Sequence, residues 1–236
     1  MTPEELLADL GRQLEAAIDP AYLEVAQSFS KEPIERHGVR APELKRICAN
    51  AWPEWSKWPR ARRNAFCESL WQCGLFEEGA VAIYLYGRLG ETCGRREFRL
   101  FERWINRYVH NWGHCDGVAG CLVAASIANV PELIDELPRW TRSRNRWKRR
   151  GAAVSLLLEG KAGRHTDRIF EIAGLLLEDQ DDLVQKGTGW LLKETYPKKP
   201  ADVVAFLEPR KHLPTRTLLR YAAEKMSQAD RRRVLG

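Results

Sequence analysis

Apolar residues recur along the chain at the three- and four-residue spacing of amphipathic helices, and no segment alternates like a strand. Thr2 and Glu5 form a capping box around Pro3, which opens the first helix. Further starts are indicated at Pro20, Pro42 and Pro59. We predict helices over residues 2–18, from 19 onwards, and over 42–52, 59–73, 77–89, 96–110, 114–129, 131–141, 145–159, 165–178, 181–195, 200–207 and 214–224.

The predicted helices are joined by short turns, and no glycine- or serine-rich linker separates them. This rhythm is typical of helical pairs stacked into a repeat array. We therefore predict an all-α fold, a HEAT-like helical repeat solenoid formed by a single domain over residues 1–236. The period is inferred from helix rhythm because no repeat in residue identity is visible. Such an array curves, and its concave face is a natural surface for an elongated ligand.

Composition places the chain among soluble globular proteins, with 44% hydrophobic and 30% charged residues. No apolar run approaches the roughly 20 residues that span a bilayer. The acidic N-terminal segment lacks the basic start and apolar core of a signal peptide, so we expect a cytoplasmic protein without a membrane partner. The six cysteines show no CxxC spacing, which argues against a disulfide framework.

Positive charge is concentrated after the first helices. The formal net charge is +6, but residues 1–28 carry six acidic side chains and one basic, which leaves +11 for the remaining chain. The run RWTRSRNRWKRR, residues 139–150, contains seven basic residues and no acidic one. Positive charge spread over several segments suits a polyanion, which favours a concave basic face. A basic protein with no nucleic-acid role remains the alternative.

Arg150 breaks the pattern of its predicted helix. At 100° per residue, Trp147, Val154, Leu157 and Leu158 share one side, and Arg150 falls among them. A guanidinium on an apolar stripe is costly unless a carboxylate or another anion meets it. The alternative is an arginine whose stem packs while its head reaches water.

Two glycines flank a tryptophan in the predicted helix 181–195. Gly187 and Gly189 lie in a helix interior, where glycine costs about 0.5–1 kcal/mol relative to alanine. Something must therefore approach the backbone closely there, either a packed helix or a ligand. For Trp190, core packing is the default interpretation on this evidence alone.

The segment 110–116 contains several candidate functional groups. Gly113 is expected to turn the chain, so that a new helix begins near Asp116, where a carboxylate could simply cap the helix. His110 and His114 have the i, i+4 spacing of metal ligands, and Cys115 follows. Because no second ligand pair follows, we expect no metal site.

Four segments, in order, resemble motifs of the AlkD family of HEAT-like DNA glycosylases. They are HGVRAPELKR at 37–46, NWGHCD at 111–116, NRWKRRGA at 145–152 and QKGTGWLLK at 185–193. The resemblance extends over most of the chain. Gly113, Gly151 and Gly187 depart from it, since bulkier residues are commoner at these positions.

The resemblance implies a site made of Asp116 as catalytic carboxylate, Trp112 and Trp190 as aromatic walls, and Arg150 as a cation near the DNA backbone. Its implied activity is hydrolysis of the N-glycosidic bond of cationic N3- or N7-alkylated purines in duplex DNA, without a cofactor. A one-domain solenoid with a single ligand cleft gives no reason to expect more than a monomer. No lysine is indicated as a Schiff-base nucleophile, so we expect base release without strand cleavage. Candidate phosphate contacts are Arg40, Lys45, Arg46, Arg149, Arg150 and Lys186.

Two other classes of function remain open. A catalytically inactive HEAT-like protein that binds DNA structures would keep the basic face without the chemistry. A protein-interaction scaffold is disfavoured by the +11 charge after residue 28.

Overall fold

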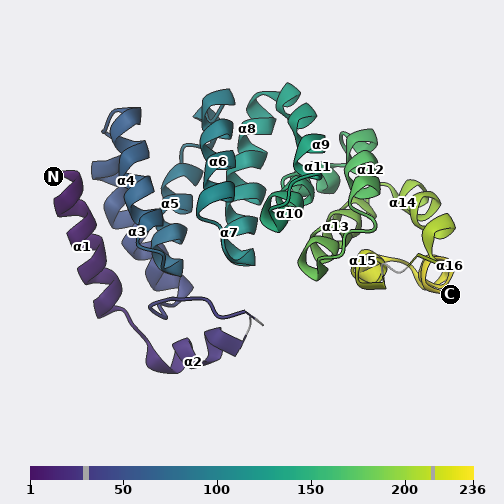
Figure 1. The fold of residues 1–236 in the computed structure, drawn as a ribbon, viewed down its shortest axis with the longest axis horizontal. Helices are drawn as coiled ribbons and strands as arrows, with labels where there is room; N and C mark the ends of the chain where they lie inside the picture. The colour runs from purple at the N-terminus through teal and green to yellow at the C-terminus, as the bar shows by residue number, and fades with distance from the viewer. Residues whose placement is uncertain (29–31, 214–215) are drawn as a thin grey trace. The chain divides into compact units, whose positions relative to one another are not determined.

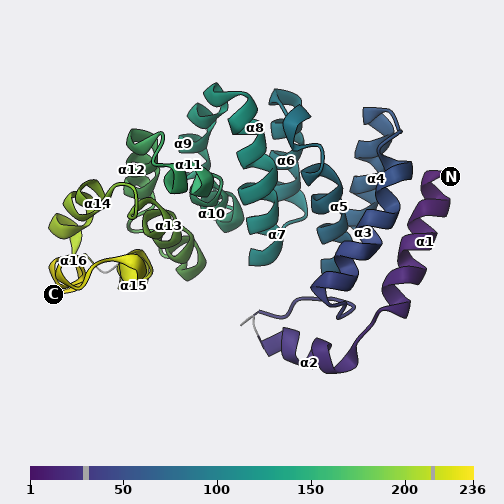
Figure 2. The ribbon, with the colours of Figure 1, turned by 180° about the vertical axis from the view of Figure 1, so that it is seen from behind.

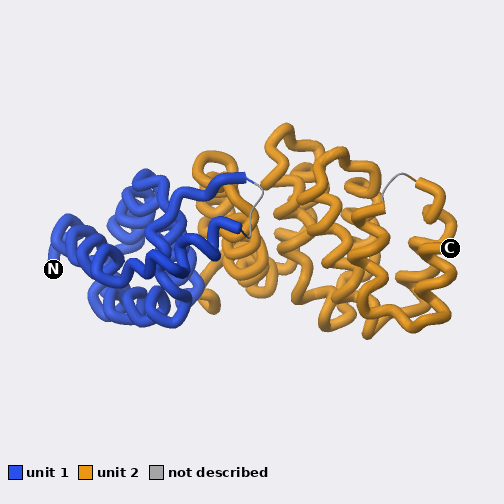
Figure 3. The backbone as a smooth tube through the Cα atoms, turned by 90° about the horizontal axis from the view of Figure 1, so that it is seen from below, with its two compact units in different colours: residues 1–89 blue, residues 90–236 orange. Residues whose placement is uncertain are grey.

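The computed structural model describes residues 1–28, 32–213 and 216–236. The chain forms two compact units, Met1–Leu89 and Gly90–Gly236 (Figure 3). Both units are built from helices, and the described residues contain no strand beyond an isolated antiparallel bridge between Ile18 and Val39. The all-α prediction is confirmed. None of the helices in the described ranges is both long and apolar enough for a membrane crossing. The single domain over 1–236 stays a prediction.

The first unit contains five helices of the described ranges: α1 (Pro3–Ala16), α2 (Pro20–Ser28), α3 (Ala41–Trp55), α4 (Arg60–Gln72) and α5 (Phe76–Gly87). The predicted capping box is confirmed, because the Glu5 amide donates to the Thr2 hydroxyl and the Thr2 amide donates to the Glu5 carboxylate. The loop before α3 is held by the buried Glu77 carboxylate, which accepts three successive amides at residues 37–39.

The second unit carries the candidate catalytic residues. Its elements are η1 (Gly90–Thr92), α6 (Arg95–Arg107), α7 (Trp112–Gly117), the π-helix η2 (Val118–Val123), α8 (Ala124–Asn129), η3 (Pro131–Glu136), α9 (Leu137–Trp140), α10 (Arg146–Val154), α11 (Leu157–Ala162), α12 (Thr166–Leu175), α13 (Asp182–Thr195), α14 (Pro200–Leu207), η4 (Glu208–Arg210), α15 (Arg216–Ala222), η5 (Ala223–Lys225) and α16 (Gln228–Leu235). In the ribbon views α6, α7 and α8 lie side by side (Figure 1, Figure 2). Helix α10 packs against α7 and α13, and α13 packs against α15.

Large side chains fill the core of the second unit. Phe98 and Trp140 are fully buried, with ring centroids 5.4 Å apart, and Trp104 is buried beside Phe101 at 5.5 Å. Each fully buried side chain of this size contributes about 1.5–3 kcal/mol through removal of apolar surface from water. These side chains come from α6 and α9, and both helices pack against α10.

The predicted helix 114–129 differs from the structure at its start. The helix begins at Trp112 because the Asn111 side chain accepts the His114 amide at 2.8 Å and caps it. Gly113 is therefore helical and does not turn the chain. The segment then passes through the π-helical turn η2 before α8. Such turns often lie at functional sites.

The predicted helix 145–159 is two helices. Ser155 and Leu156 separate α10 from α11, so the phase of the apolar stripe changes there. Trp147, Val154 and Leu157 are buried as expected, but Leu158 is 52% exposed, and its predicted place on the buried side is wrong.

Smaller differences occur elsewhere in the second unit. The predicted helix 131–141 is the 3₁₀ segment η3 followed by the short α9. The predicted helix 214–224 starts at two residues, 214 and 215, that lie outside the described residues. Helix α16 was not predicted, although its cap is a readable signal: the Ser227 hydroxyl accepts the Asp230 amide at 3.1 Å.

Candidate active site

Asp116 lies in the second turn of α7, one turn after Trp112 and on the same face of the helix. The side chain that caps this helix is Asn111, so the interpretation of Asp116 as a helix cap is wrong. The Asp116 side chain is 18% exposed and therefore remains partly accessible to solvent.

Arg150 meets Asp116 in a bidentate ion pair. Its Nε and Nη2 donate to the two carboxylate oxygens, each at 2.8 Å, and its Nη1 donates to the Leu183 carbonyl at 2.5 Å. The residue is only 6% exposed, so the alternative of an arginine whose head reaches water is wrong, and the anion that meets Arg150 is a carboxylate. Burial by itself would lower the pKa of Arg150, but the hydrogen bonds and charge of Asp116 outweigh it and raise that pKa.

The two glycines of α13 are explained by neighbouring helices. A Cβ at Gly187 would lie 3.1 Å from the Arg150 Cγ and 3.3 Å from its Nη1. A Cβ at Gly189 would lie 2.6 Å from the Tyr221 Cβ and 2.7 Å from the Leu218 carbonyl oxygen. Gly187 thus makes room for Arg150, and Gly189 lets α15 approach the backbone of α13.

The two candidate tryptophans lie on the helices that flank the ion pair. Trp112 is 40% exposed, unusual for so large an aromatic side chain. Trp190 is half-buried, three residues after Gly187, and its Nε1–H donates to the Glu194 carboxylate at 3.2 Å. Core packing therefore does not account for Trp112, and Trp190 has a specific hydrogen-bond partner.

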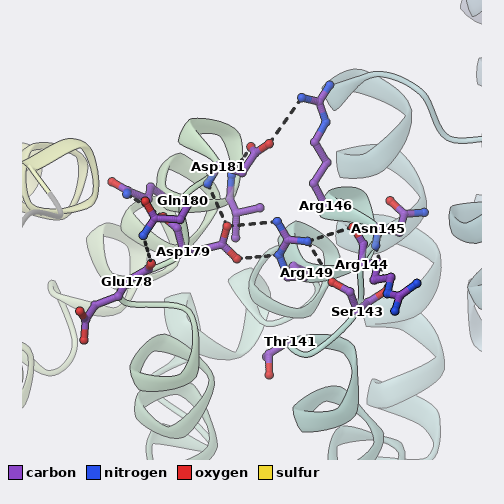
Figure 4. A network of polar contacts seen from close by, with 12 residues as sticks. Thr141, Ser143, Arg144, Asn145, Arg146, Arg149, Glu178, Asp179, Gln180 and Asp181 are labelled. Atoms are coloured by element: carbon purple, nitrogen blue, oxygen red, sulfur yellow. Dashed lines mark hydrogen bonds and ion pairs between the residues drawn. The ribbon is translucent and has the colours of Figure 1, made fainter.

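Several of the predicted phosphate contacts are already paired with carboxylates. Arg149 forms a two-point contact with Asp179, at 2.6 and 3.2 Å, and also donates to the carbonyls of residues 143 and 144 (Figure 4). Lys186 lies 2.6 Å from Asp182. In the first unit, Arg40 contacts Asp19 and Arg46 contacts Glu43, whereas Lys45 is exposed.

The basic run 139–150 is largely neutralised. Five of its seven cations contact carboxylates of the second unit: Arg139, Arg146, Lys148, Arg149 and Arg150. Arg142 and Arg144 are exposed and have no ion-pair partner in the part of the chain that the structure describes. The sequence around these seven cations does not indicate which of them are paired, because the carboxylates that pair with them lie on other helices.

One of these pairs also fixes the start of α13. Asp181 caps that helix by accepting the amides of Leu183 and Val184, and it contacts Arg146 at 3.4 Å (Figure 4). The start of α10 is thereby tied to the start of α13. This arrangement supports the Leu183 carbonyl that receives Arg150.

The segment 110–116 holds no metal ligand set. His114 is buried and its Nδ1 lies 3.0 Å from the Asn111 side-chain nitrogen. Across residues 1–28, 32–213 and 216–236, no three His, Cys, Asp or Glu side chains are grouped so that they could hold a metal ion.

Comparison with known proteins shows the family and the fold of the chain. The family model for DNA alkylation repair enzymes matches residues 10–226. The structure of a predicted DNA alkylation repair enzyme from Enterococcus faecalis superposes with a TM-score of 0.79 at 17% identity, covering 89% of this chain and 97% of that one. The protein smu.31 from Streptococcus mutans UA159 gives a TM-score of 0.63 at 16% identity, covering 78% and 93% of the two chains.

No curated protein matches the sequence at a significant level. At these identities the two solved structures show a common fold, whereas the family model matches most of the chain's length. The resemblance found in the four sequence motifs is confirmed at the level of the family. The chain therefore belongs to the DNA alkylation repair enzyme family, which assigns it a role in DNA repair with DNA as its partner.

Proposed function

We propose that the chain is a monofunctional DNA glycosylase that acts as a monomer on duplex DNA. It hydrolyses the N-glycosidic bond of N3- or N7-alkylated purines, whose base carries a positive charge, and leaves an abasic site. The observation that carries this proposal is the orientation of the Asp116–Arg150 pair. The Asp116 side chain is 18% exposed and that of Arg150 is 7% exposed, so the negative end of the pair is nearer to solvent.

A carboxylate in this position matches the charge that develops during the reaction. Breaking the glycosidic bond of an alkylpurine builds positive charge on the deoxyribose, and a fixed anion stabilises that charge. Arg150 occupies one lone pair on each oxygen of Asp116, which leaves others to orient a water molecule. Asp116 thus stabilises the sugar and positions the nucleophile.

Arg150 supports the reaction by holding Asp116. A bidentate guanidinium fixes the plane of the carboxylate through two parallel hydrogen bonds. The contact between Arg150 and the DNA backbone stays a prediction. Holding the Asp116 carboxylate is a second proposed role of Arg150.

The tryptophans contribute through their aromatic faces. A cation over a tryptophan ring gains about 0.5–2 kcal/mol without any hydrogen bond. Trp112, one turn from Asp116, is exposed enough to receive the damaged nucleotide. Trp190 provides the opposite wall in this proposal.

The proposal is tested by incubating the protein with methylated duplex DNA and measuring free 3-methyladenine and 7-methylguanine. Wild-type protein should release base and leave the strand intact. Asp116→Asn should lower the single-turnover rate by about 100-fold, since it removes the charge that stabilises the transition state. DNA affinity should change little.

Asp135→Asn is the matched control, because this exposed aspartate of the second unit pairs with Arg168 away from the site. It should keep wild-type activity. Tight DNA binding without any base release by the wild type would instead favour the catalytically inactive DNA binder.

A further inference from the structure

Glu194 is a buried carboxylate, 8% exposed, that has no role in the site described above. It lies one helical turn after Trp190 on α13. One of its oxygens accepts the Trp190 Nε1–H at 3.2 Å, and the other contacts the Lys225 ammonium of η5 at 2.6 Å. We infer that Glu194 is a positioning residue, which holds the indole plane of Trp190 in the orientation that the site uses.

The hydrogen bond restricts the rotation of the Trp190 indole ring. The χ2 torsion of tryptophan is broad, so a half-buried indole can rotate about its Cβ–Cγ bond. An acceptor at Nε1 selects one rotation and therefore one face toward the ligand. Hydrogen bonds to an ionised acceptor are roughly twice as strong as neutral ones, so Glu194 holds the ring firmly.

The Lys225 ammonium stabilises the Glu194 carboxylate in its buried position. An unpaired buried carboxylate would take up a proton and weaken as an acceptor. Burial acts to raise the pKa of Glu194, but Lys225, with smaller contributions from Lys161 and Trp190, lowers it overall. Lys225 of η5 and Lys161 of α11 are the charged groups that act on this carboxylate within the described residues. Glu194 therefore stays ionised at neutral pH.

A second buried carboxylate of the same unit shows what is particular to Glu194. Glu159 is 6% exposed, and both of its oxygens accept from Arg164, each at 2.9 Å. Glu159 thus binds Arg164 with both oxygens and lies 3.7 Å from the His165 Nε2, whereas Glu194 divides its oxygens between a cation and an aromatic ring of the candidate site. This makes Glu159 a matched control for burial and charge.

The experiment follows the indole Nε1–H resonance of Trp190 by NMR, assigned by its loss in Trp190→Phe. Glu194→Met removes the acceptor and should displace this resonance and speed its hydrogen exchange by about 10-fold. Glu194→Gln keeps an oxygen acceptor and should restore most of the wild-type position. Glu159→Met should leave the resonance unmoved.

Lys225→Met removes the cation that contacts Glu194 but keeps the hydrogen bond between Trp190 and Glu194. Loss of the cation raises the pKa of Glu194, so the pH at which the Trp190 resonance shifts should move upward relative to wild type. This variant also keeps the inference testable if Glu194→Met does not fold.

The catalytic consequence rests on the proposed function. Glu194→Met should lower the single-turnover rate of base release by about 3- to 10-fold and change half-saturation by less than about twofold, because the ring is misoriented rather than lost.

The experiments distinguish a failure of the proposed glycosylase function from a failure of the positioning role of Glu194. If wild-type protein releases no base, the proposed function fails, and the NMR measurements still decide the role of Glu194. An unmoved Trp190 resonance in Glu194→Met, or an unchanged pH dependence in Lys225→Met, overturns the positioning role.

Discussion

Asp116 and Arg150 illustrate how strongly a buried charge depends on its partner. Arg150 was removed from bulk water when α7, α10 and α13 packed together, whereas Asp116 stays partly exposed. A buried ion pair adds little net stability, but removal of one partner strands the other. The pair is therefore better understood as a device that fixes a carboxylate than as a source of folding energy.

This argument makes a prediction about stability. Arg150→Met should lower the free energy of unfolding by about 1–3 kcal/mol, because it leaves the partly exposed Asp116 without a counter-ion. Combining it with Asp116→Asn should cost less than the two single changes together, with a coupling of about 1–3 kcal/mol. Urea unfolding of all four proteins measures this coupling, and additive costs would mean that the two side chains act independently.

At the scale of the element, the glycines show which contacts between helices have space for an added Cβ atom. Gly151 faces α6, η2 and α9, and a Cβ there would meet Ala119, Ile105 and Trp140 at 3.6 Å each, which is ordinary contact. Gly189 faces α15, where a Cβ would overlap the Tyr221 Cβ at 2.6 Å. The same substitution should therefore have opposite signs in the two helices.

Gly151→Ala should stabilise the protein by about 0.5–1 kcal/mol, since alanine restricts the unfolded chain and fits the native space. Gly189→Ala should destabilise it by about 1–3 kcal/mol, because the backbone of α15 must move. Thermal or urea unfolding of the two variants measures both effects. Destabilisation by Gly151→Ala would show that the contact around α10 is tighter than the structure indicates.

At the scale of the whole molecule, net charge is a poor guide to which cations meet DNA. The chain carries +6, yet Arg149 and Lys186 contact aspartates of their own unit. An intramolecular carboxylate competes with a phosphate for the same guanidinium or ammonium. Exposed cations that have no such partner among the described residues, Arg142 and Arg144 among them, are better candidates for phosphate contacts.

Arg144→Gln should weaken binding to unmodified duplex DNA and reduce the slope of log K against log salt by about 1, because one fewer counterion is released. Arg233→Gln is the control, since Arg233 is also exposed but contacts Glu208 at 2.6 Å. Binding isotherms at several salt concentrations measure both slopes. A slope unaltered by Arg144→Gln would exclude this residue from the DNA interface.

Local signals were sufficient for the helical content of the chain. The capping box at Thr2 and Glu5 and the prolines at helix starts act within one turn of backbone, so they can be interpreted without the fold. The anomalous position of Arg150 on an apolar stripe also follows from helix periodicity alone, and it correctly required an anionic partner.

Packing between segments that are distant in the sequence decided two features. It determined which anion contacts Arg150 and where the predicted helices are interrupted. Asp116 lies 34 residues from Arg150, and Asp179 lies 30 from Arg149. The interruption of α10 at Ser155, the exposure of Leu158 and the neutralised basic run follow from neighbours that helical spacing does not specify. Periodicity acts over a few residues, whereas ion pairing and close backbone approach are properties of the assembled helices, so only the tertiary structure supplies them.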